Sequence, residues 1–166
     1  MDSLELTPGF EHEILKKILQ TQKDLIEKLK LKSIFLNEDY KLFLNKFHNV
    51  KTFWTLYGPS DLKSINVNKN VTMLVLYGGF SGSDVQFLSI FPNLTEISFH
   101  RKILFETLCC LPNVCNNLTS LLLFSISPGN YRNLKFSASK KFHLDFFEGG
   151  NDWSDFVISN PIARVN

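Results

Sequence analysis

A short apolar phrase recurs along the chain and limits the possible folds more than any other feature. It has apolar residues at its first, fourth and sixth positions, except that the sixth position of the second copy is Thr55. The first residues of its copies are 24, 21, 23 and 24 residues apart: Ile26, Val50, Val71, Leu94 and Leu118. The residue before the second to fifth copies is always asparagine, at Asn49, Asn70, Asn93 and Asn117. Because this agreement extends beyond hydrophobicity, the phrase is an internal repeat in which each copy is one structural unit.

The spacing of the copies predicts a leucine-rich repeat, whose period of roughly 20 to 29 residues gives one strand and one returning helix or turn per unit. We therefore expect an α/β solenoid of about five repeats, with a curved parallel sheet and short convex helices. The strands should be centred near Leu29, Phe53, Leu74, Ile97 and Leu121. Since one unit cannot bury its apolar side alone, stacking of neighbouring units is expected to form the core.

The segments between the copies are predicted to return the chain from one strand to the next. Residues 39–47, 83–91 and 103–111 have the spacing of short helices, and the third should end at Pro112 because proline interrupts helical hydrogen bonding. Residues 59–69 are more polar and suggest a single helical turn.

Three regions are expected along the chain. Residues 1–25 are predicted to be an N-terminal capping helix, with an amphipathic pattern over 10–25, and residues 26–148 are expected to form the leucine-rich-repeat region. Within that region, residues 142–146 alternate like a further strand. Residues 149–166 contain glycine and proline without periodicity, so an irregular C-terminal tail is expected.

Composition narrows the classes of partner. The 18 basic and 16 acidic residues give a net charge of +2, which is too even to drive binding to nucleic acid or membrane by electrostatics alone. Cys109, Cys110 and Cys115 are an odd number of cysteines in one short stretch, which favours a reducing compartment over a secreted disulfide framework. With no signal-peptide pattern and no long apolar run, we expect an intracellular protein, cytoplasmic or nuclear, with neither nucleic acid nor membrane as a partner.

No residue pattern points to catalysis, a metal or a cofactor. The three cysteines lack the paired spacing of a zinc site, and the four histidines are scattered. The glycine-rich stretch 78–83 lacks the lysine of a phosphate-binding loop and is interpreted as a turn between strand and helix. Three glycosylation sequons begin at Asn70, Asn93 and Asn117, but they belong to the repeat phrase, so no glycan is expected.

The phrase also predicts which side chains are available to a partner. Side chains alternate along a strand, so if the apolar positions face the core, the third, fifth and seventh positions face outward onto the concave sheet. From these positions we predict a partner-binding surface with a basic edge beside an apolar strip: Lys28, Lys30, Lys32, Trp54, Leu56, Met73, Val75, Tyr77, His100, Leu122 and Phe124.

Several segments resemble one protein family. The runs Phe91–Ile97 and Asn117–Leu121, together with Ile18–Leu25 before Leu29–Leu31, look like the leucine-rich-repeat region of F-box proteins over about residues 14 to 125. The resemblance implies a substrate-receptor subunit of a ubiquitin ligase, in which the repeats hold the target and a ligase adaptor is a second partner.

The chain departs from that family before the repeats. Glu13–Leu19 is similar to one phrase of an F-box, but no complete F-box is present, and the same residues also fit a plain capping helix. Two binding functions therefore stay open: target recognition for ubiquitination, and a scaffold or inhibitor outside any ligase that uses the same concave face. Co-purification with a ligase adaptor would distinguish them. A third hypothesis, an α/β enzyme, would require a cleft with convergent polar groups.

Overall fold

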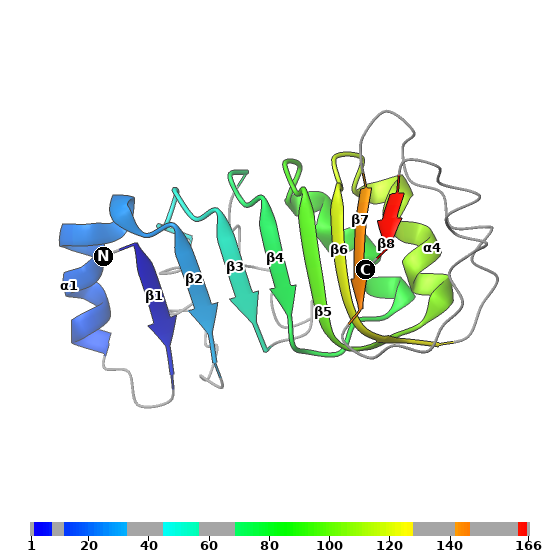
Figure 1. Ribbon diagram of the computed structural model, residues 1–166. Helices are drawn as coiled ribbons and strands as arrows, with labels where there is room; N and C mark the ends of the chain where they lie inside the picture. Colours follow the sequence, from blue (N-terminus) through cyan, green and yellow to red (C-terminus); the bar gives the residue numbers. More distant parts are fainter. Residues whose placement is uncertain are drawn as a thin grey trace.

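A single open sheet organises the protein. In a computed structural model the chain is described over residues 2–7, 12–32, 45–56, 69–127, 142–146 and 163–165. These residues form an α/β structure whose strands lie in sequence order, with every neighbouring pair parallel (Figure 1). The strands are β1 (Ser3–Leu6), β2 (Lys28–Leu31), β3 (Thr52–Thr55), β4 (Met73–Leu76), β5 (Glu96–Ile103), β6 (Ser120–Ile126), β7 (Phe142–Phe146) and β8 (Ala163–Val165).

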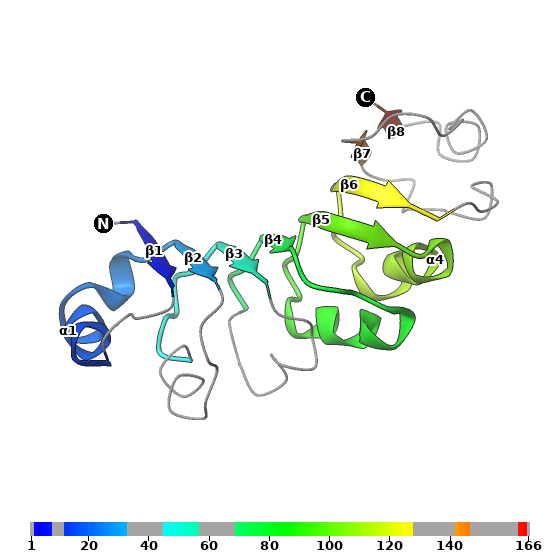
Figure 2. The same cartoon turned by 90° about the horizontal axis from the view of Figure 1, so that it is seen from below.

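The register of the sheet confirms the parallel strands that the repeated phrase predicts. The fourth positions of consecutive copies lie side by side, in the order Leu29, Phe53, Leu74, Ile97 and Leu121. The expected strand over 142–146 continues the row, with Leu144 beside Leu121. Figure 2 shows that the sheet curves and that the helices lie on its convex side. The described connections from β4 to β5 through η2 and from β5 to β6 through α4 therefore return over the same face, as a crossover between parallel neighbours does.

The described helices are short: α1 (His12–Gln22), η1 (Lys23–Leu25), η2 (Gly82–Ile90) and α4 (Phe105–Val114), where η marks a 3-10 helix. Helical structure is thus confirmed within 10–25, 83–91 and 103–111. The stretch 78–83 does lead from β4 to η2, where Asp84 accepts hydrogen bonds from the Ser81 N–H at 2.9 Å and hydroxyl at 2.7 Å. No described helix is long and apolar enough to cross a membrane.

The prediction that Pro112 ends the third helix is wrong. Helix α4 continues through Pro112 to Val114, and the Cys115 N–H closes its last turn on the Leu111 carbonyl at 2.8 Å. A proline inside a helix costs roughly 3 kcal/mol. Leu108 and Leu111 on this helix are 0% exposed, so burial of its apolar side offsets the loss.

Both ends of the sheet differ from the sequence expectations, and two predicted connections lie mostly outside the described residues. Strand β1 occupies residues expected to be only a helical cap, and β8 is a short strand in the tail expected to be irregular. Of the helix predicted over 39–47, residues 45 and 46 form a turn and 39–44 lie outside the described residues. Nearly all of the predicted turn over 59–69 also lies outside them.

The core lies between the sheet and the convex layer. First positions of the phrase are buried, from Ile26 at 0% exposed to Leu118 at 5%, and so are the described fourth and sixth positions. Thr55 stands where an apolar residue is expected and is itself buried. From the convex side the Phe91 ring lies 6.5 Å from that of Phe53. This packing fixes the opposite sheet face as the one directed away from the core.

Candidate protein-binding face

The third, fifth and seventh positions of the phrase form the concave face of the sheet. Parallel register sets the fifth positions in one row, which runs Glu5, Lys30, Trp54, Val75, Ser98, Leu122 and Asp145. In Figure 2 this face lies on the inside of the curve, opposite the helices. The third and fifth positions lie within the strands, whereas Lys32, Leu56 and Tyr77 directly follow β2, β3 and β4.

Four side chains contact one another in series across this face. The Lys30 Nζ lies 4.3 Å from the centre of the Trp54 ring, a cation–π distance. The Trp54 and Tyr77 rings are 6.2 Å apart and tilted, and Tyr77 stacks on His100 at 4.2 Å with 20° between the planes. Mutual contact restricts the rotamers of these residues, so little side-chain entropy remains to be lost on binding.

Three lysines, two within β2 and one directly after it, are paired with carboxylates of the N-terminal segment. Lys32 Nζ lies 2.9 Å and Lys30 Nζ 3.8 Å from Glu5, while Lys28 Nζ lies 3.6 Å from Asp2. The hydrogen bond from Lys32 lowers the pKa of Glu5 below its ordinary value. The basic edge expected from sequence is thus partly neutralised, although lysines still outnumber carboxylates.

Aromatic and basic residues enclose a pocket near the carboxyl ends of β2 and β3. Its volume is about 290 Å³, and its lining residues are Lys30, Leu31, Lys32, Trp54, Thr55, Leu56 and Tyr77. Five of the seven were predicted from sequence as partner-binding residues. A concave apolar surface with a few charged groups at its edge is the usual composition of a ligand site.

The remaining predicted contact residues divide into accessible and inaccessible ones. Leu56 and Phe124 are 40% and 37% exposed, and Met73 and Leu122 are half-buried. Val75 needs correction as a contact residue because it is 2% exposed. The alternation of side chains along β4 places Val75 on the concave side. Its side chain is small, so larger neighbouring side chains cover it. It can support the surface without contacting a partner.

Hydrogen bonds fix the far end of the ring series. His100 Nε2 and the Ser98 Oγ are 3.0 Å apart, and burial lowers the pKa of His100 below its ordinary value. Arg101 Nε donates to the Tyr77 carbonyl at 2.9 Å. Sequence reasoning missed Arg101 and Glu5 as neighbours of the candidate surface. Glu5 had a detectable signal, because the first six residues, from Met1 to Leu6, fit the repeat phrase.

The repeated asparagines have a structural role at the amino ends of the strands. Each Nδ2 donates to a backbone carbonyl one unit earlier, at 2.6–3.0 Å: Asn49 to Asp24, Asn70 to His48, Asn93 to Lys69 and Asn117 to Pro92. The hollow along this edge has a volume of about 500 Å³ and includes three of these asparagines. Its polar groups are therefore already used to hold neighbouring units together.

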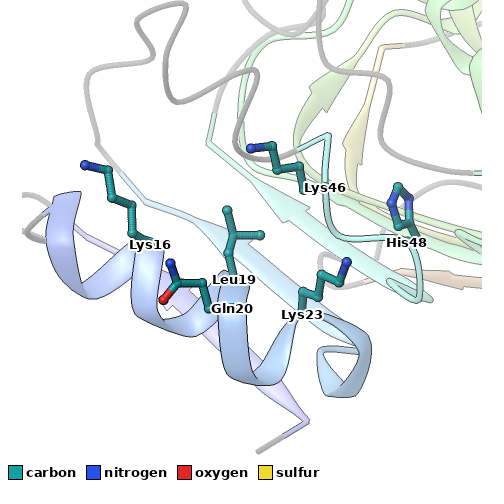
Figure 3. A pocket seen from close by; sticks show the side chains of 6 residues that line it. All are labelled: Lys16, Leu19, Gln20, Lys23, Lys46 and His48. Atoms are coloured by element: carbon teal, nitrogen blue, oxygen red, sulfur yellow. The ribbon is translucent and has the colours of Figure 1, made fainter.

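A second hollow lies beside α1, at a place that sequence reasoning did not single out. Figure 3 shows its lining side chains, which enclose about 400 Å³: Lys16, Leu19, Gln20, Lys23, Lys46 and His48. All except Leu19 are exposed, and Lys16 is paired with Glu13 at 2.8 Å. This is an open basic surface, without the fixed aromatic walls of the concave pocket.

The described residues contain no cluster of three or more His, Cys, Asp or Glu side chains that could hold a metal ion. All three cysteines are free thiols, with Cys110 exposed and Cys115 buried. Burial raises the pKa of Cys115 to about 11, which opposes formation of the reactive thiolate.

Comparison with known proteins gives no further guide to the use of these surfaces. No protein-family model matches the chain, and no curated protein matches it significantly.

Proposed function

We propose that the chain is a leucine-rich-repeat solenoid of about five repeats that binds another protein on its concave face. The observation that carries this proposal is the connected series of Lys30, Trp54, Tyr77 and His100, which lies beside the exposed Leu56. Tryptophan and tyrosine contribute large contact areas at protein interfaces, and a connected apolar patch on a surface commonly marks a partner site.

Target recognition for a ubiquitin ligase is the more specific form of the proposal, and it rests on the resemblance to the repeats of F-box proteins. Its alternative is a scaffold or inhibitor outside any ligase. Both use the same face, and neither calls for catalysis, a cofactor, nucleic acid or a membrane. Affinity purification of the full chain from its own cells separates them, because a ligase adaptor accompanies the partner in the first case and is missing in the second.

Two substitutions on the face test the binding function itself. Trp54→Ala and Tyr77→Ala should each weaken capture of the partner by about 1 to 4 kcal/mol while leaving Tm nearly unchanged. Because the two rings contact each other, the double variant should lose less than the sum of the single losses.

The control is Gln86→Ala, which alters an exposed side chain of η2 on the convex side and should leave capture unchanged. Capture that is unchanged in both ring variants would remove the concave face from consideration. A large fall in Tm would instead assign the rings to the folding of the chain.

A further inference from the structure

The concave pocket combines apolar walls with positive charge, and this combination restricts what it can accept. We propose that it receives one aromatic or large aliphatic side chain of a partner peptide whose adjacent residues are acidic, an inference that rests on the proposed protein-binding function. The volume of about 290 Å³ is small for a pocket and suits one side chain.

The apolar part of the argument comes from Trp54, Leu56 and Tyr77. The two rings are 6.2 Å apart at 35°, which leaves their faces inclined to each other. The Tyr77 ring also stacks on His100, which restricts its position. Leu56 lines the pocket and is 40% exposed. An entering ring or aliphatic group would gain the area that these walls now expose, with the walls already arranged.

The charge argument comes from Lys30 and Lys32. Both contact Glu5, at 3.8 and 2.9 Å, so this corner of the pocket already holds one carboxylate within the chain. Two cations against that carboxylate leave a net positive charge. An acidic residue beside the anchor would be attracted to it, whereas a basic residue would be repelled.

Nucleic acid shares the aromatic and anionic character of such a peptide but fits the surface less well. Binding of a phosphate backbone requires many unopposed cations. Here Lys28, Lys30 and Lys32 all lie near carboxylates of the N-terminal segment, and the whole chain has a net charge of +2. A peptide that carries only a few carboxylates can be attracted by this small excess of positive charge.

Selection from a library of random peptides displayed on phage tests the inference without knowledge of the partner. Parallel selections use the full wild-type chain and its Trp54→Ala variant. The expected consensus has one aromatic or large aliphatic residue with Asp or Glu beside it, and it should vanish with the variant. Thermal denaturation of the variant confirms that it remains folded.

The best peptide is then synthesised and its affinity measured by fluorescence anisotropy. Trp54→Ala should weaken binding about tenfold or more, as loss of a central anchor does. Lys30→Met and Lys32→Met keep most of the side-chain length, so they should weaken binding about threefold to tenfold and reduce its salt dependence. Lys69→Met, an exposed lysine away from the pocket, should change nothing.

The outcomes separate this inference from the function beneath it. A basic consensus, a consensus without an apolar anchor, preferred binding of single-stranded RNA, or self-association lost in Trp54→Ala would overturn the acidic-peptide assignment. Sensitivity to Phe124→Ala in place of Trp54→Ala would overturn the pocket and leave the concave face as the binding surface. Failure to enrich any peptide, or peptide binding that neither variant affects, would overturn the pocket assignment. The protein-binding face is rejected separately, by partner capture that Trp54→Ala and Tyr77→Ala leave unchanged.

Discussion

Removal of one central core side chain tests the assignment of the core directly. Leu74 is 0% exposed, and its neighbours at the same position on the adjacent strands are Phe53 and Ile97. Leu74→Ala deletes three buried carbons, which costs about 2.5 kcal/mol of transfer free energy at roughly 0.8 kcal/mol each. The sheet fixes both neighbours at repeat spacing, so the cavity cannot collapse fully, and the total loss should reach about 3 to 5 kcal/mol.

Urea denaturation followed by far-UV circular dichroism measures this loss as a lower midpoint with an unchanged slope. For a chain of this size the same loss lowers Tm by about 6 to 20 °C. Leu104→Ala is the matched control, because Leu104 is 52% exposed and should lose less than about 1 kcal/mol. Equal effects of the two substitutions, or a change below about 1 kcal/mol for Leu74→Ala, would refute the core assignment.

Three further predictions concern the asparagines, the cysteines and His100. Asn93→Ala should lower the free energy of unfolding by about 0.5 to 1.5 kcal/mol, because it removes the hydrogen bond to the Lys69 carbonyl of the preceding unit. The control Asn116→Ala, at an exposed asparagine, should change this free energy by less than about 0.5 kcal/mol. Equal losses for the two variants in urea denaturation would refute a structural role for Asn93. A thiol reagent should modify exposed Cys110 in the folded chain and Cys115 only after unfolding, as mass spectrometry of the modified peptides will show; rapid modification of Cys115 would contradict its burial. NMR titration should give His100 a pKa below about 6.5, so its contribution to stability is present above that pH and lost as pH falls through the lower folded pKa. A value above 6.5 would show that burial does not control this histidine.

The sequence alone predicted the parallel strands, their register and most of the core. In a stack of repeats, the contacts of each unit are made with the units directly before and after it, so a pattern that recurs along the chain becomes a row in space. The alternation of side chains then assigns residues such as Leu56 and Tyr77 to the concave face. Nothing about this step depends on contacts between distant parts of the chain.

Other features depended on the environment that the tertiary structure supplies. Helix α4 continues through Pro112 because the burial of its apolar side outweighs the lost hydrogen bond, and no local pattern contains that balance. Val75 faces the predicted side yet is covered, since exposure depends on the sizes of its neighbours. The sequence therefore determined which side chains share a face. Contact between Trp54 and Tyr77, which belong to consecutive units, was decided by the tertiary structure, because the curvature of the sheet sets how closely their side chains approach on the concave side.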